Sequence, residues 1–127
     1  MRRIALLLAV VALAACNNDS TSPNGSVVGS YSLRTVNGNP LPYTFSNGSV
    51  LVSDQLTLNS NGTYTDVATF SNVNSTPEQG YWSINNNLIS FTDQVTNTSY
   101  TGSLSGSVLT ETFALNSGTL TEVYQRD

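Results

Sequence analysis

LTLNSNGTY, residues 56–64, is the stretch of sequence that decides the fold class. Apolar and polar side chains alternate on both sides of the turn, and a period of two residues is typical of a β-strand with one buried face. Asn and Gly adopt the positive φ angles that tight turns between antiparallel strands require. The stretch therefore predicts a β-hairpin in which a three-residue turn at 60–62 sets Leu58 opposite Tyr64.

The same alternation continues on both sides of this hairpin, with turn residues every eight to twelve positions and no amphipathic stretch of three helical turns. Sequential hairpins without crossovers indicate an antiparallel up-and-down meander, which removes its free edges by closing into a barrel. A two-sheet sandwich is the alternative. Only two connections are long, 37–48 with its two Pro residues and 73–79 with Pro77. The eight expected strands are 27–36, 49–59, 63–72, 79–85, 88–94, 98–104, 108–115 and 119–126.

The composition excludes several classes of function. Residues 16–127 hold two Arg and eight Asp or Glu, a formal net charge of −6, and the chain has neither Lys nor His. We expect no nucleic-acid partner, because little in this range neutralises phosphates. One Cys without His or Lys leaves no Ser-His-Asp triad, Cys-His dyad or His-ligated zinc, and the domain is too small for a sugar-cleaving cleft. We expect no enzyme, no metal and no cofactor.

The first fifteen residues differ from the rest. Two Arg precede an apolar run at 4–13 that is too short to span a bilayer and has the anatomy of a secretory signal. LAAC, residues 13–16, then resembles the lipobox of bacterial lipoproteins, which implies that Cys16 is acylated, with palmitate for example, and begins the mature chain. An ordinary signal peptidase site is the alternative. Asn17 is not the Asp that retains many lipoproteins at the inner membrane, so the resemblance implies export and anchoring at the outer membrane.

The chain thus divides into three parts. Residues 1–15 are the predicted lipoprotein signal peptide, and 16–26 are the lipidated Cys16 and a flexible tether without apolar side chains after it. Residues 27–127 form the predicted domain, which contacts the membrane through the lipid anchor only.

Several segments of this domain are similar to small bacterial lipocalin-like domains. GSYSL at 29–33 resembles the Gly-x-Trp opening of lipocalins, with Tyr31 in place of Trp. LTLNSNGTY at 56–64 and GYWSI at 80–84 resemble their hairpins, and VYQR at 123–126 resembles their closing strand. The resemblance implies an all-β fold, an eight-stranded antiparallel up-and-down meander closed as a lipocalin-like β-barrel of the calycin type. It also implies that Arg126 packs across Tyr31 and closes the barrel base.

Alternation and turn lengths define the inner face of the barrel. The turn at 86–87 sets Ile84 opposite Ile89 and Trp82 opposite Phe91. The inward rows are then Tyr31, Leu33, Val52, Leu56, Leu58, Tyr64, Phe70, Trp82, Ile84, Ile89, Phe91, Leu109, Phe113 and Leu115. Our candidates for the lining of a ligand cavity are Tyr31, Asp54, Leu56, Tyr64, Asp66, Phe70, Trp82, Phe91, Glu111 and Phe113.

Acidic residues share these rows, namely Asp54, Asp66, Glu111 and Glu122. The predicted pairing makes Asp54 and Asp66 diagonal neighbours, roughly 7–8 Å apart at the backbone. Unpaired carboxylates in an apolar barrel need Tyr hydroxyls, Arg, water, a cation or a ligand. One interpretation is a polar floor in a cavity that prefers basic or hydrogen-bonding ligands. The other, which we favour because bulges are common in barrels, is that a β-bulge in each strand turns the acids to solvent.

We therefore expect a lipid-anchored bacterial envelope protein whose barrel binds a small apolar or amphiphilic molecule, with the 37–48 loop at the mouth. The alternative is a non-enzymatic structural or protein-interaction module with a packed barrel. The 37–48 loop also allows an inhibitor that enters another protein's cleft. An open cavity of about 300 Å³ or more favours the ligand-binding function over a packed module.

Overall fold

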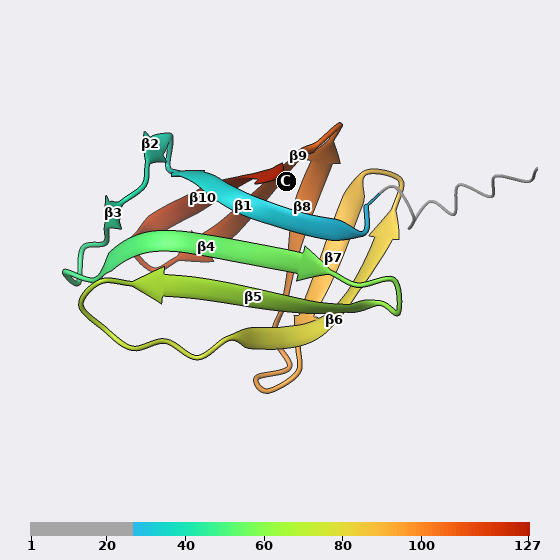
Figure 1. The fold of residues 1–127 in the computed structure, drawn as a ribbon, viewed down its shortest axis with the longest axis horizontal. Coiled ribbons are helices and arrows are strands. Elements are labelled where there is room, and N and C mark those ends of the chain that lie inside the picture. Colours follow the sequence, from blue (N-terminus) through green and yellow to red (C-terminus); the bar gives the residue numbers. More distant parts are fainter. Residues whose placement is uncertain (1–26) are drawn as a thin grey trace, which may run out of the picture.

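The computed structural model describes residues 27–127 (Figure 1). Residues 1–26, with the predicted signal peptide, Cys16 and the tether, lie outside the described residues. The described part contains no helix with the length and apolarity needed to cross a bilayer. Its strands are β1 (Gly29–Val36), β2 (Asn39–Pro40), β3 (Tyr43–Thr44), β4 (Val50–Leu58), β5 (Thr63–Phe70), β6 (Glu78–Asn85), β7 (Leu88–Asp93), β8 (Ser99–Ser105), β9 (Val108–Leu115) and β10 (Gly118–Arg126).

Eight of these strands close into an antiparallel up-and-down barrel (Figure 1). From β4 to β10 each strand pairs with the next one along the chain, and β1 pairs with both β10 and β4, which closes the ring. The predicted fold is confirmed, and the predicted strand ends agree to within two residues. In a closed ring of pairs no strand has an edge that is free along its whole length, which is the physical advantage of a barrel over a sandwich.

The hairpin at 56–64 forms with the predicted register. Leu58 pairs with Tyr64, and Gly62 takes the positive φ of 82° that closes the turn. The Asn59 N–H donates to the Thr63 carbonyl at 2.9 Å, and the indole N–H of Trp82 donates to the Asn59 carbonyl at 3.0 Å. The second predicted hairpin is also confirmed, with Ile84 opposite Ile89 and Trp82 opposite Phe91.

Two β-bulges change which side chains face the core. In β4 the pairing shifts between Leu51 and Ser53, so Leu51 is buried while Val52 is 45% exposed. The predicted inward position of Val52 is therefore wrong. In β1 a shift between Leu33 and Thr35 leaves Arg34 exposed and turns Val36 into the core. Leu115, also predicted to face inward, lines the interior cavity but is half-exposed, because it lies at the end of β9 next to the turn into β10.

The long 37–48 loop is attached to one end of the barrel. It carries β2, which pairs with β1, and β3, which pairs with β4. Asn37 fixes the loop to β10: its N–H donates to the Thr121 carbonyl at 2.7 Å, and its side-chain oxygen accepts from the Thr121 N–H at 2.8 Å. Phe45 follows β3 in the sequence, and the centroid of its ring lies 6.3 Å from that of Phe70. The loop thus adds an aromatic side chain to this end of the barrel.

The opposite end of the barrel is closed by packed side chains and by Arg126. The Arg126 guanidinium donates to the Val28 carbonyl at 2.6 Å, and Arg126 lies opposite Tyr31 in the strand register. It crosses Gly29, where an added Cβ would lie 3.2 Å from its nitrogens. The Tyr31 hydroxyl donates to the Val27 carbonyl at 2.7 Å. The side chains that fill the barrel are fully buried, and they include Tyr31, Leu56, Leu58, Ile89, Phe91 and Leu109.

Candidate functional site

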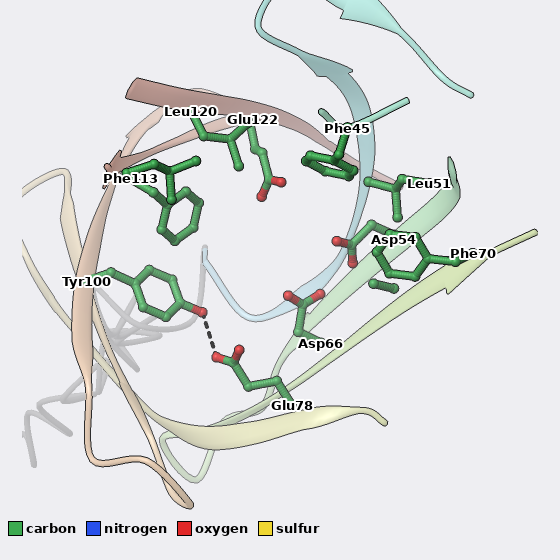
Figure 2. Close-up of a pocket in the computed structure, with 12 residues that line it drawn as sticks. Phe45, Leu51, Asp54, Asp66, Phe70, Glu78, Tyr100, Phe113, Leu120 and Glu122 are labelled. Atoms are coloured by element: carbon green, nitrogen blue, oxygen red, sulfur yellow. Dashed lines mark hydrogen bonds between the residues drawn. The ribbon is translucent and has the colours of Figure 1, made fainter. Parts of the chain in front are cut away.

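A cavity of about 310 Å³ lies inside the barrel at the end that carries the 37–48 loop (Figure 2). This is about the volume of ten water molecules in the liquid, at the lower end of the range for small-molecule sites. Side chains from the loop, β4, β5, β6, β8, β9 and β10 surround it. They are Phe45, Leu51, Asp54, Asp66, Ala68, Phe70, Glu78, Tyr100, Phe113, Leu115, Leu120 and Glu122.

The predicted cavity residues divide into two groups. Asp54, Asp66, Phe70 and Phe113 line the cavity. The remaining aromatic and aliphatic candidates, Tyr31, Leu56, Tyr64, Trp82 and Phe91, are buried in the packed core instead, as is the acidic Glu111. Periodicity identifies a side chain as inward, but it does not tell how far along the barrel axis the packing ends. Alternation alone therefore could not separate core from cavity.

An aromatic row joins the core to the cavity wall. Tyr64 meets Phe91 edge to face at 5.3 Å, and Phe91 stacks on Tyr100 at 4.9 Å. Tyr100 in turn contacts Phe113 with ring centroids 5.1 Å apart. Aromatic pairs at these distances add stability beyond the area they bury. The cavity walls at Tyr100 and Phe113 are therefore held in place by the core below them.

The acidic side chains point into the barrel. Asp54 is 7% exposed, Glu122 9% and Glu111 2%, and Asp66 is partly buried. In Figure 2 the carboxylates of Asp54, Asp66 and Glu122 all point toward the cavity. The favoured interpretation, that bulges turn the acids to solvent, is therefore wrong. The bulge in β4 precedes Asp54, and the register Asp54↔Ala68 and Leu56↔Asp66 keeps both acids on the inner face.

Tyrosine hydroxyls donate hydrogen bonds to several carboxylates of the site. The Tyr124 hydroxyl lies 3.3 Å from Oδ2 of Asp54 and 3.3 Å from Oε2 of Glu122. The hydroxyls of Tyr64 and Tyr100 both donate to Oε1 of Glu78, the latter at 3.1 Å (Figure 2). A tyrosine carries one O–H, so Tyr124 satisfies only one of its two acceptors at a time. The carboxylates outnumber these donors.

Burial in this acidic environment shifts the proton equilibria of the site. Burial, together with a hydrogen bond and the charge from Asp54, raises the pKa of Asp66 to about 10. Burial and then the charge of Asp54 raise the pKa of Glu122 to about 7, against the opposing effect of the Tyr124 hydroxyl. Burial also raises the pKa of Glu111 well above its ordinary value. At neutral pH these carboxyls therefore hold protons that solvent-exposed carboxyls would release.

The barrel wall beside the cavity opens between β8 and β9. The ladder between these strands runs from Gly102↔Glu111 to Ser105↔Val108, and the segments 99–101 and 112–115 lie beyond its end. A hollow of about 560 Å³ follows this gap on the outside, lined mostly by Ser and Thr hydroxyls. Tyr100, Phe113 and Leu115 border both this hollow and the interior cavity. These side chains therefore separate the cavity from solvent at the gap.

Two of the lining residues missed by sequence reasoning carried a usable signal. Tyr100 alternates with the half-buried Leu104 in a predicted strand, and Glu78 shares the inward row of Trp82 but lies one residue before the predicted strand. Phe45 carried no such signal, because it belongs to a loop. Within residues 27–127, no three His, Cys, Asp or Glu side chains are grouped so that they could hold a metal ion.

Comparison with known proteins adds one finding. Residues 27–124 match the family described as "Lipocalin-like domain". The matched range contains every residue that lines the cavity. No curated protein and no solved structure matches the chain.

Proposed function

The chain belongs to the lipocalin-like domain family, and from this premise we propose that its barrel binds one small apolar or amphiphilic molecule in the cavity beside Phe45. Lipocalin-like domains typically bind small hydrophobic ligands, and the family is in general a binding fold rather than a catalytic one. The observation that carries the proposal is a cavity of about 310 Å³ inside the closed barrel.

The two kinds of lining favour an amphiphile. Leu51, Phe70, Phe113 and Leu120 offer apolar surface to a hydrocarbon body. The carboxylates and the Tyr100 hydroxyl offer polar contacts to one end of the same molecule. A fully packed barrel would favour a structural or protein-interaction module instead. The cavity argues against such a module, because space lined by apolar side chains lowers the stability of a domain.

Native mass spectrometry of the full-length protein purified from the cell envelope tests this proposal. We expect a small molecule to accompany the protein at one copy per chain. Ala68→Leu adds volume inside the cavity, and the dissociation constant should rise about tenfold, since overlap of this kind costs about 1–3 kcal/mol. The bound fraction should therefore fall. The matched control is Ala114→Leu, which adds the same volume to an exposed position outside the barrel and should leave the ligand bound. Equal occupancy in the two variants would contradict a ligand in this cavity.

The proposal includes export and a lipid anchor at Cys16, with the outer membrane as the location. Its support is the LAAC motif behind an apolar run in the sequence. Several acyl chains give stable anchoring where one gives only reversible binding. Cells fed an alkyne analogue of palmitate should label the full-length chain but not Cys16→Ser. Asn17→Asp should keep the label and move the protein to the inner membrane. A labelled Cys16→Ser chain would refute the anchor.

A further inference from the structure

Four carboxylates line the cavity without a basic side chain beside them. Asp54, Asp66, Glu78 and Glu122 come from four different strands, β4, β5, β6 and β10. The chain has no Lys or His, and its two Arg residues in the described part lie elsewhere. Arg34 is exposed on the outside of β1, and Arg126 donates to the Val28 carbonyl at the other end of the barrel. The acidic side chains of the cavity are thus not paired with a basic side chain in its lining.

Specific oxygen atoms in this part of the barrel are also left without partners. Asp54 is more than nine-tenths buried, and in the described residues its Oδ1 atom accepts no hydrogen bond. The same holds for Oδ1 of Asp66, and deeper in the barrel for Oε1 of Glu111. A buried acceptor without a donor costs about 1–3 kcal/mol, and more when it is charged. Asp54 and Asp66 point into the cavity beside each other (Figure 2), where a bound molecule would reach both.

The remaining lining sets the size and character of the occupant. Phe45, Phe70 and Phe113 border the same space as the two aspartates. A bare metal ion would leave most of about 310 Å³ unused, and the described carboxylates are not grouped as a metal site. An organic cation with an apolar body uses both parts of the lining. Its ammonium group carries up to three N–H donors, which suits acceptors that tyrosine hydroxyls do not reach.

We propose that the ligand of this barrel is a small organic cation, an alkyl or arylalkyl ammonium, whose nitrogen contacts Asp54 and Asp66 and whose apolar body lies against Phe45, Phe70 and Phe113. This inference rests on the proposed function and specifies its ligand class. Aromatic faces near the nitrogen add a further attraction for a cation. The raised pKa values of Asp66 and Glu122 agree with it, because bound protons partly supply the positive charge that an ammonium would bring.

Three probes of nearly equal size test the charge preference: octylamine, octan-1-ol and octanoate. Each is titrated by calorimetry into the purified full-length protein at pH 8, where the amine is still protonated. We expect octylamine to bind at least about tenfold more tightly than octan-1-ol, as charge-assisted hydrogen bonds are about twice as strong as neutral ones. Octanoate should bind most weakly, because its charge repels the aspartates.

Substitutions then locate the preference. The double variant Asp54→Asn, Asp66→Asn should reduce the advantage of octylamine over octan-1-ol to less than about threefold. Asp127→Asn is the matched control, because Asp127 is exposed and hydrogen-bonded by Ser32 outside the cavity, and it should keep the full advantage. Should the double variant fail to fold, chemical shifts of Phe70 and Phe113 on addition of octylamine to the unmodified protein locate the ligand instead.

The outcomes separate this inference from the proposed function. Equal affinity for octylamine and octan-1-ol, or tightest binding of octanoate, would overturn the cation and leave the ligand-binding barrel in place. An advantage of octylamine that persists in the double variant, or shifts confined to the outer surface, would also overturn it. Binding of none of the three probes would overturn both proposals.

Discussion

Glu122→Gln should make the protein more stable at neutral pH, and the gain should disappear in acid. Glu122 is 9% exposed, and its pKa of about 7 stands above the ordinary 4.5 because of burial first and the charge of Asp54 next. A group whose pKa is raised by folding binds protons more tightly in the folded state. The contribution of Glu122 to the free energy of unfolding is therefore fully present below about pH 4.5 and is lost as the pH rises through about 7.

The size of the effect follows from the two pKa values of Glu122. A rise from 4.5 to about 7 corresponds to about 3 kcal/mol of unfolding free energy lost at pH 8. Asp66, whose pKa is raised from 3.8 to about 10, also makes the folded state less stable as the pH rises between these two values. The wild-type protein should therefore lose at least about 3 kcal/mol of stability between pH 4.5 and pH 8. Gln keeps the shape of Glu and a carbonyl acceptor for Tyr124. Between pH 4.5 and pH 8, Glu122→Gln should therefore lose about 3 kcal/mol less unfolding free energy than the wild type.

Urea unfolding at the two pH values, at one ionic strength, measures this difference. Urea is preferable to guanidinium, which is itself a cation and would compete for the acidic cavity. Asp127→Asn removes the same charge outside the barrel, and its pKa is lowered by hydrogen bonds from Ser32 and Gln55. Its effect on stability therefore lies in the acid range, and between pH 4.5 and 8 it should follow the wild type. Stability that rises with pH, or the same slope in Glu122→Gln as in the wild type, would refute the reasoning.

Two further results follow from the same structure. Gly80→Ala should destabilise the protein by about 1–3 kcal/mol in thermal unfolding, because the added Cβ would lie 2.0 Å from the Thr92 carbonyl oxygen. Gly102→Ala should cost less, because the nearest atom, at 2.9 Å, is a terminal carbon of the Leu109 side chain and not the backbone; equal losses would contradict the steric argument. Octylamine binding at pH 7 should release protons, because a cation lowers the raised pKa of Asp66 and Glu122. Calorimetry in buffers of different ionisation enthalpy measures that release, and buffer-independent heats would exclude it.

Turn chemistry made much of the fold predictable from the sequence. Asn61-Gly62 and Asn86-Asn87 fix both the position and the length of their turns, and turn length sets register. That is why Leu58↔Tyr64 and Ile84↔Ile89 could be predicted from short stretches of sequence. The bulge at Val52 could not, because alternation of Val, Ser and Asp fits either face equally well. One inserted residue inverts every side chain before it, so Leu51 and Val52 exchanged their predicted places.

The site was less predictable than the fold, because a cavity is defined by where packing stops. The acids themselves were visible in the sequence, but the usual penalty for buried charge argued for turning them outward. That argument treats the barrel as uniformly apolar. In the structure Asp54, Asp66, Glu78 and Glu122 lie at the loop end, beside Tyr hydroxyls and open space. Phe45 reaches the cavity only because β2 and β3 attach the loop to the sheet.

This division along the barrel axis separates stability from binding. At the closed end, Leu58, Ile89 and Leu109 are at most 1% exposed, and removing such side chains costs several kcal/mol each because cavities form. At the loop end, burial and then the charge of Asp54 raise the pKa of Asp66 and Glu122, which works against folding at neutral pH, so the closed end has to supply the compensating stability. Buried carboxyl groups lower the stability of a domain, and a small domain has little stability to lose. Such groups are therefore expected where a ligand binds them. Neutralising the acids should therefore stabilise the empty barrel while weakening its affinity for a cation, a trade that a purely structural cluster would not show.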